Sequence, residues 1–303
     1  MGLFEKWVES LDYEYEILQK CTRQKSPRST CSNCVEVCQR NAISIKNGIP
    51  ILNAAKCNEC GKCIAACPVQ AVAGIFPQRM IIQNQLVAFK TEEAPEVKEL
   101  LIFYKKGVKT IITEDNELDG NWEEKIYEVN RILEVLGEPL ISVSFQEIQQ
   151  EEKKYTRKEL LTAWRKEGQS LMKQMVPAKW RFNQNDLDLA KYYPNYQFAQ
   201  ISLDADQCTL CGACQKLCDK NCFTITDSSF MISAQKCSAC RLCQDTCPEK
   251  AIVIEEKVMP NTPIDIPKLH KTCTSCHKQF ETLSDANDEC IPCVKRKGFM
   301  IAH

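Results

Sequence analysis

Cysteine is the residue type with the clearest chemical meaning in this chain of 303 residues, which contains 21 of them. Seventeen lie in two blocks and four in a C-terminal segment. An odd number in a long chain without an expected export signal argues against a disulfide framework. Thiolates three residues apart on a tight turn converge on one metal centre, whereas disulfides prefer partners from separate segments. The distribution therefore predicts metal ligation.

One spacing recurs in both blocks. The motifs are Cys31-x2-Cys34-x3-Cys38 and Cys57-x2-Cys60-x2-Cys63-x3-Cys67 in the first block, then Cys208-x2-Cys211-x2-Cys214-x3-Cys218 and Cys237-x2-Cys240-x2-Cys243-x3-Cys247 in the second. A short β-like run follows each motif, and Asn47-Gly48 supplies turn chemistry between the halves of the first block. Each block is therefore predicted to be an internally duplicated unit.

On these motifs each block resembles a bacterial two-cluster ferredoxin, over roughly residues 21–75 and 205–256. In that family the fourth cysteine of each motif ligates the other cluster. The resemblance implies four sets of ligands for about four [4Fe-4S] clusters: Cys208, Cys211, Cys214 and Cys247; Cys237, Cys240, Cys243 and Cys218; Cys57, Cys60, Cys63 and Cys38; and Cys31, Cys34 and Cys67 with a fourth residue to be found.

The first motif departs from the family, because Arg28 stands where its first cysteine is expected. Cys21, ten residues before Cys31, is the spare thiol nearby, and a polar loop lets it return to the cluster. We predict that Cys21 is the fourth ligand; the alternative is a free thiol beside an incomplete, three-iron or labile cluster. Cys222, four residues after Cys218, is predicted to be a small buried hydrophobic residue.

The C-terminal segment is predicted to be a zinc-ribbon-like tail over residues 268–296. Its pairs, Cys273-x2-Cys276 and Cys290-x2-Cys293, have the spacing of two knuckles that close on one tetrahedral ion. Rubredoxin-type iron is the alternative, but its knuckles continue with glycine, whereas His277 and Val294 follow the pairs here. Zinc is therefore the preferred metal.

Residues 81–200 contain no cysteine and need a core of their own. Their hydrophobic periodicity predicts a β-α-β-α-β order, with strands at 86–89, 108–113 and 140–145 and helices at 95–106 and 122–136, which suggests a small parallel sheet. The charged segment 146–176 is predicted to be a long helix. The predicted fold class is α+β: two ferredoxin-like modules, at 1–80 and 201–260, flank a small α/β middle domain at 81–200, and the tail follows.

These features predict an electron-transfer protein that passes single electrons between a redox donor and a partner oxidoreductase, such as a molybdenum-dependent dehydrogenase or a hydrogenase. A nucleotide-binding glycine motif is absent, so a substrate site of its own is not expected. The formal net charge of −1 does not favour nucleic acid, and no apolar stretch is long enough to span a membrane, so a cytoplasmic location is expected. The alternative function is an iron-sulfur redox sensor or assembly factor that docks through the middle domain and the tail.

Overall fold

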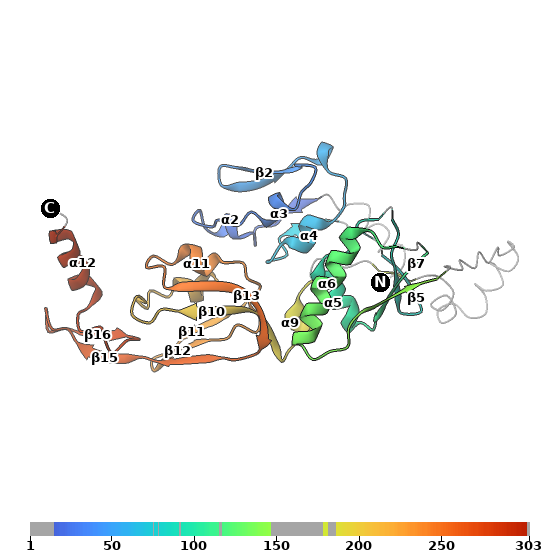
Figure 1. The fold of residues 1–303 in the computed structure, drawn as a ribbon. Coiled ribbons are helices and arrows are strands. Elements are labelled where there is room, and N and C mark those ends of the chain that lie inside the picture. The colour runs from blue at the N-terminus through green and yellow to red at the C-terminus, as the bar shows by residue number, and fades with distance from the viewer. Residues whose placement is uncertain are drawn as a thin grey trace, which may run out of the picture. The chain divides into compact units, whose positions relative to one another are not determined.

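The computed structural model describes residues 15–74, 76–77, 79–90, 92–114, 117–146, 178–180 and 186–301. The chain divides into two compact units, coloured by residue number in Figure 1. The first unit includes residues 57–65 and 74–187, and the second includes residues 15–56, 66–73 and 188–303. The division into four segments that the sequence suggests stays a prediction.

The first unit is built on a five-stranded sheet with the order β8-β7-β6-β5-β9. The strands are β5 (Arg79–Ile82), β6 (Gln85–Val87), β7 (Thr110–Thr113), β8 (Ser142–Phe145) and β9 (Ala178–Trp180). Strands β6, β7 and β8 are parallel, as the β-α-β-α-β pattern predicts, and β5 is antiparallel to both of its neighbours. Strands β5 and β9, of which only β5 runs against the others, were not predicted from the sequence. The helix predicted for 146–176 lies outside the described residues apart from residue 146.

Two helices connect the parallel strands and bury the core of this unit. Helix α5 (Val97–Lys105) ends before Gly107, whose φ of +104° favours glycine, and α6 is Gly120–Val135. Right-handed connections between strands in sequential order place both helices on one face of the sheet, and α5 and α6 contact each other. The helix predicted at 122–136 corresponds to α6, which buries Ile126, Val129 and Leu133.

Helix α5 also carries a buried carboxylate. Arg79 Nε of β5 donates a hydrogen bond of 2.9 Å to Glu99, whose side chain is only 1% exposed. Burial raises the pKa of Glu99, while the Arg79 charge opposes that rise. The ion pair between Arg79 and Glu99 thus ties this sheet to its covering helix.

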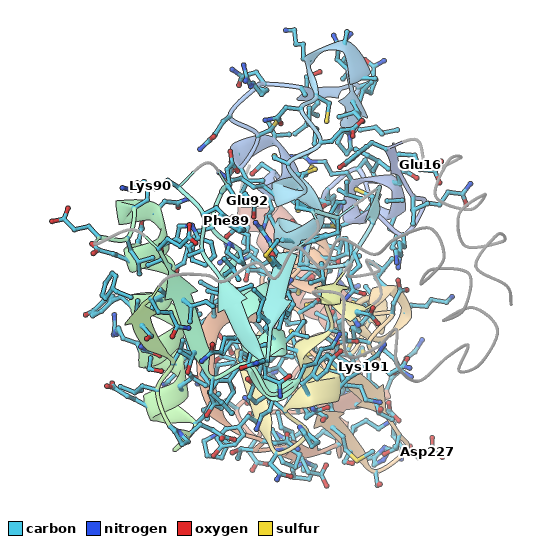
Figure 2. The ribbon with its side chains drawn as sticks, turned by 90° about the vertical axis from the view of Figure 1, so that its right-hand side faces the viewer. Glu16, Phe89, Lys90, Glu92, Lys191 and Asp227 are labelled. Carbon is cyan, nitrogen blue, oxygen red and sulfur yellow. The ribbon has the colours of Figure 1, made fainter. Side chains whose placement is uncertain are left out.

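After β6 the chain turns through Phe89, Lys90 and Glu92, where the Glu92 N–H donates to the Phe89 carbonyl at 3.1 Å (Figure 2).

The second unit contains the C-terminal cysteine region, residues 196–260. Its elements follow the order strand, helix, hairpin, helix, strand: β10 (Tyr196–Leu203), α10 (Ala213–Leu217), β11 (Phe223–Ile225), β12 (Ser229–Ile232), α11 (Leu242–Thr246) and β13 (Ile252–Pro260). The outer strands β10 and β13 pair antiparallel, and β11 and β12 form a hairpin. Phe223, Phe230 and Ile252 are among the residues of the core between these layers.

The N-terminal cysteine region, residues 15–74, shows a similar order in shorter elements. They are β1 (Glu16–Ile17), α2 (Thr22–Lys25), α3 (Asn33–Glu36), β2 (Ile43–Lys46), β3 (Ile49–Leu52), a 3-10 helix at Ala54–Lys56, α4 (Lys62–Ala66) and β4 (Val72–Ala73). Strand β1 pairs with β4, and β2 pairs with β3 around Asn47-Gly48. Positive φ angles of 51° and 79° at these two residues confirm the predicted turn.

The tail follows a strand that joins the C-terminal cysteine region. Strand β14 (Ile264–Pro267) extends the β11-β12 hairpin to three strands, and the tail itself consists of β15 (Leu269–Thr272), β16 (Gln279–Thr282) and α12 (Ile291–Ile301). The hairpin β15-β16 brings Cys273 and Cys276 to one end, facing the start of α12. Among the residues that the structure describes, no helix is long and apolar enough to cross a membrane.

Candidate metal centres

The cysteine motifs fold into a recurring turn. In the motifs that begin at Cys57, Cys208 and Cys237, the residue before the second cysteine and the residue after it both have positive φ: Glu59 and Gly61, Leu210 and Gly212, and Ala239 and Arg241. The third cysteine then lies on a short helix, α4, α10 or α11. This backbone path explains why three thiols at x2 spacing are presented on one side of the turn.

The Cys31 motif differs from the other three. Cys34 lies on helix α3, as the third cysteine of each motif does, but Thr30 and Ser32, which stand before and after the second cysteine Cys31, have no positive φ. Arg28, at the position of the missing cysteine, hydrogen-bonds through Nη1 to the Thr246 carbonyl at 3.4 Å. Arg23 of helix α2 donates to the Cys31 and Thr30 carbonyls, the latter at 3.0 Å. The arginines therefore stabilise this loop where the other motifs use a tight turn.

The structure gathers one set of four thiols around a cavity at the end of β10. Cys208, Cys211, Cys214 and Cys247, here called the Cys208 set, all line it, together with Leu203, Ile225 and Phe230. Burial raises the pKa of Cys214 to about 12, and the neighbouring thiols of Cys208 and Cys211 add to the rise. Three members come from one motif and Cys247 comes from the other, as the resemblance implies.

A second set lines a cavity of about 200 Å³ beside helix α11. Its members are Cys218, Cys237, Cys240 and Cys243, here called the Cys237 set. Burial raises the pKa of Cys240 to about 11, and the thiols of Cys237, Cys218 and Cys31 add to the rise. Cys222 lines the same cavity and is 2% exposed. The sequence correctly predicted that Cys222 is buried, but not that it lines the cavity of this set.

A third group of thiols contains Cys21. Burial raises the pKa of Cys34 to about 12, and the thiols of Cys67, Cys31 and Cys21 each contribute to that rise. The pKa of Cys21 is itself raised by burial, with added contributions from Cys67 and Cys31. The four residues, here called the Cys31 set, thus interact with one another within one compact unit. Helix α2 begins directly after Cys21, which is its N-cap residue.

The remaining predicted set, Cys38 with Cys57, Cys60 and Cys63, stays a prediction because its members belong to both compact units. Two of these thiols accept hydrogen bonds from nearby backbone N–H groups. Ala42 donates to Cys38 at 3.2 Å, and Glu59 donates to Cys57 at 3.4 Å.

Both cysteine regions contact each other within the second unit. Asp245 of helix α11 accepts hydrogen bonds from the Thr30 N–H at 2.7 Å and the Thr30 hydroxyl at 3.0 Å. Lys25 forms an ion pair with Asp219, and Lys25 and Thr22 line the cavity of the Cys237 set. Cys31 also adds to the electrostatic environment of Cys240. The Cys31 set and the Cys237 set are therefore neighbours.

The tail holds its four cysteines much more tightly. The Sγ atoms of Cys273, Cys276, Cys290 and Cys293 all lie within 4.8 Å of one another, and those of Cys276 and Cys290 are 3.7 Å apart. A tetrahedron with metal–sulfur bonds of about 2.3 Å has edges of about 3.8 Å. Backbone hydrogen bonds, chiefly from Cys290, lower the pKa of Cys273 to about 6. This geometry and donor chemistry fit a single tetrahedral ion.

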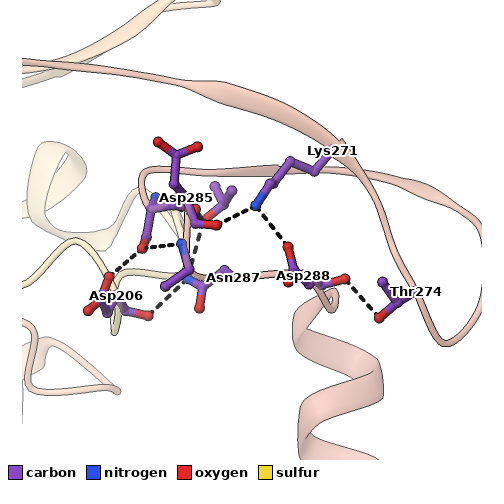
Figure 3. Close-up of polar contacts among 9 residues, drawn as sticks. Asp206, Lys271, Thr274, Asp285, Asn287 and Asp288 are labelled. Atoms are coloured by element: carbon purple, nitrogen blue, oxygen red, sulfur yellow. Dashed lines mark hydrogen bonds and ion pairs between the residues drawn. The ribbon is translucent and has the colours of Figure 1, made fainter.

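Polar contacts attach the tail to the C-terminal cysteine region (Figure 3). The Asn287 amide donates to the Asp206 carbonyl at 3.0 Å, and the Ser284 hydroxyl donates to the Asp206 carboxylate. Within the tail, Lys271 Nζ donates to the Asp285 carbonyl at 2.6 Å and to the Asp288 carboxylate at 3.0 Å. Asp206 lies two residues before Cys208, so these contacts link the loop of the Cys208 set to the tail.

Cluster-binding chemistry fits the thiols of the cysteine regions better than single-ion chemistry does. A four-iron cube takes each of its sulfur ligands on a different iron atom, so the ligands stand further apart than around one ion. Among the residues that the structure describes, only the tail gives a group of potential ligands within 4.8 Å. The wider sets, whose thiols are mostly half-buried, supply the soft, anionic donors that iron-sulfur clusters require.

Comparisons with known proteins agree with this chemistry. A family model described as a 4Fe-4S dicluster domain matches residues 28–71, which lie in the N-terminal cysteine region. An uncharacterized ferredoxin of Methanocaldococcus jannaschii is 46% identical over 44 residues, which are 14% of this chain and 29% of that relative. The chain thus matches less than a third of the relative. A ferredoxin-type iron-sulfur domain is present here, and it points to electron transfer.

Proposed function

We propose that this chain is an iron-sulfur electron-transfer protein that carries about four [4Fe-4S] clusters and passes single electrons between a redox donor and a partner oxidoreductase. The observation that carries the proposal is the grouping of thiols from separate motifs into sets of four, the Cys208 set and the Cys237 set above all. When bound, each cluster supplies a centre that accepts and releases one electron. The protein's own residues hold the clusters and determine their surroundings.

The crossed origin of the ligands supports a role in electron transfer. Cys247 joins the Cys208 set and Cys218 joins the Cys237 set, so helices α10 and α11, together with their C-cap residues, each contribute to both sites. The two helices also pack against each other. Such shared ligation keeps two clusters close together at a fixed separation, which favours fast electron transfer between them. The matching element order of the N-terminal cysteine region supports a second two-cluster module there.

Contacts between the cysteine regions support a route from one module to the other. The hydrogen bonds from Thr30 to Asp245 and the ion pair between Lys25 and Asp219 lie beside the Cys237 set. Cys31 contributes to the electrostatics of Cys240 across this contact. We infer that electrons pass between the clusters of the Cys31 set and the Cys237 set, with Cys21 as the fourth ligand of the former.

For the tail we propose zinc. Four thiolates at tetrahedral spacing satisfy zinc completely and leave no open position for catalysis, so the ion has a structural role. The contacts of Asn287 and Ser284 with Asp206 support a tail that braces the C-terminal module. Partner classes that fit a carrier of this kind are molybdenum-dependent dehydrogenases and hydrogenases, which receive electrons from or deliver them to iron-sulfur subunits.

The test of the carrier function is a reversible redox titration of anaerobically purified protein, followed by EPR. We expect uptake of about four electrons per chain and full recovery of the oxidised clusters on reoxidation. When less reductant is added than there are clusters, we expect the electrons to distribute over all clusters in a single kinetic phase. Loss of clusters during one cycle of oxidation and reduction would contradict a carrier and favour the redox-sensor alternative. Two separate kinetic phases would contradict the route between the modules while leaving each module a carrier.

A further inference from the structure

The β2-β3 hairpin of the N-terminal cysteine region presents an apolar face to solvent. The register pairs Ser44 with Ile51 and Lys46 with Ile49, so these four side chains share one face of the hairpin. All four are exposed, and Ile49 and Ile51 are 42% and 46% exposed. The opposite face includes Ile43, which is buried. The outward face, here called the hairpin face, therefore places two large aliphatic side chains in contact with water.

The C-terminal cysteine region has a matching hairpin with different side chains. Residues 38–67 align with residues 218–247 without a gap, because every cysteine of the shared spacing falls on a counterpart. The positions of the hairpin face are occupied there by Thr224, Thr226, Ser229 and Met231. Strand β14 also extends that hairpin, and its Asp265 pairs with Met231. The two exposed isoleucines are therefore not required by the hairpin itself.

The outer edge of β3 is unsuited to a further strand. In the C-terminal hairpin, Phe230 of β12 pairs with Ile266 of the added strand β14. The corresponding residue of β3 is Pro50, which has no N–H to donate to a neighbouring strand. Proline at such an edge is a common protection against strand addition. A partner at this hairpin therefore has to bind through the side chains of the hairpin face.

The residues around the hairpin face are basic. Residues 37–56 contain no acidic side chain and three exposed basic ones, Arg40, Lys46 and Lys56. The matching residues 217–236 contain two lysines and two aspartates. Residues 15–36, which include the elements β1 and α2 that contact β3, add four basic and two acidic side chains. The whole chain has a formal net charge of −1, so this positive charge is local. Apolar side chains within a basic surround fit a partner with an acidic surface.

The hairpin also begins beside a thiol of a predicted cluster site. The Ala42 N–H donates to Cys38 Sγ at 3.2 Å, and the Asn53 N–H donates to the Ala42 carbonyl at 2.7 Å. Ala42 precedes β2 and Asn53 follows β3, so the base of the hairpin is tied to Cys38. The set that contains Cys38 stands at the N-terminal end of the proposed route, because the contact with the C-terminal module involves the Cys31 set.

We propose that the hairpin face docks an acidic redox protein that exchanges single electrons with the cluster of Cys38. This inference rests on the proposed function, because it requires a carrier with a cluster at that site. The basic side chains attract the acidic surface during the encounter, and Ile49 and Ile51 lose their contact with water in the complex. One electron passes in each encounter, so that the partner's redox centre is reduced as the cluster is oxidised, or the reverse.

The experiment gives the hairpin face the residues of its C-terminal counterpart. In the double variant Lys46→Thr/Ile49→Ser both positions are exposed, so the iron and sulfide contents should stay unchanged. The probe is an acidic flavodoxin, which is mixed in its oxidised form with the reduced protein at low ionic strength. We expect the second-order rate of flavodoxin reduction to fall about tenfold and to depend less on salt. Stopped-flow absorbance of the flavin measures this rate.

The matched control is the double variant Lys236→Thr/Val253→Ser. It removes one exposed lysine and one exposed aliphatic side chain from the C-terminal cysteine region, and we expect it to leave the rate unchanged. A basic cytochrome c serves as the second probe, and its rate should not fall in the hairpin variant. An unchanged flavodoxin rate in the hairpin variant would overturn the proposal. An equal loss in the control would do the same, because it would assign the effect to charge in general.

Other results separate this inference from the carrier function. If the unchanged protein takes up electrons reversibly but does not reduce flavodoxin, the acidic partner is overturned and the carrier function stands. If the unchanged protein sediments as a dimer and the hairpin variant as a monomer, the hairpin face is a contact between two copies of this chain, which also overturns the proposal. If the unchanged protein takes up no electrons reversibly, both proposals fail.

Discussion

The C-terminal cysteine region and the tail use the same Cys-x2-Cys pair for two different kinds of site. In the tail, two pairs close on each other and place four Sγ atoms within 4.8 Å. In the C-terminal cysteine region, a third cysteine follows each pair on a short helix, and the fourth thiol comes from the other motif. The sets there surround cavities, one of about 200 Å³. The pair alone therefore does not determine how far apart the thiols stand; the residues that follow it do.

The largest expected effect comes from removing one ligand from each kind of site. Cys240→Ser removes a thiolate from the Cys237 set, so we expect the loss of one cluster, about four of some sixteen irons and the same number of sulfides, while the tail metal stays. Iron, sulfide and zinc analysis of the purified variant measures this. Loss of all clusters together would break the description of two separate modules.

The matched variant is Cys276→Ser in the tail. It should release the single ion and leave iron and sulfide unchanged, because the tail thiols take no part in the cluster sets. Release of iron from this variant would show that the tail ion is iron rather than zinc. Together the two variants test whether the wide and the tight arrangements hold different metals.

A smaller effect, the loss of about one iron per chain, is expected when Cys21, the proposed ligand outside any motif, is replaced. Cys21→Ser should convert the cluster of the Cys31 set to a three-iron form, visible by EPR in the oxidised sample, since the other three irons keep their thiolates. Cys222→Ala is the control, because it removes a buried thiol that is not a ligand in this account. Unchanged iron and EPR in Cys21→Ser would mean that Cys21 is a free thiol.

Local sequence signals predicted much of this molecule. The Asn47-Gly48 turn and the helix predicted at 122–136 are encoded within short segments, and the structure confirms both. The order of parallel strands followed from alternating β and α patterns. The sequence did not predict strand β5, because its four residues begin with Arg79. A charged residue is expected at the surface, but Arg79 pairs with the buried Glu99. When a charged residue of a strand is neutralised by a residue far away in the sequence, the residues near the strand give little indication that it is buried.

The sites were predictable in their residue types rather than in their contacts. Motif spacing identified the thiols, and a comparison of the four motifs could have singled out Cys222 against Ala42, Ala71 and Ala251. By contrast, the hydrogen bonds from Thr30 to Asp245 join residues 215 positions apart. Nothing near either residue predicts them, because this contact depends on how the cysteine regions pack within the second unit.

The most direct test of the central claim is the content of iron, acid-labile sulfide and zinc per chain in anaerobically purified protein. The account predicts about sixteen irons, an equal number of sulfides and one zinc. About eight irons and sulfides would contradict it by limiting the clusters to one module. A chain with iron but no sulfide would contradict it entirely, because the cysteine sets would then hold single ions.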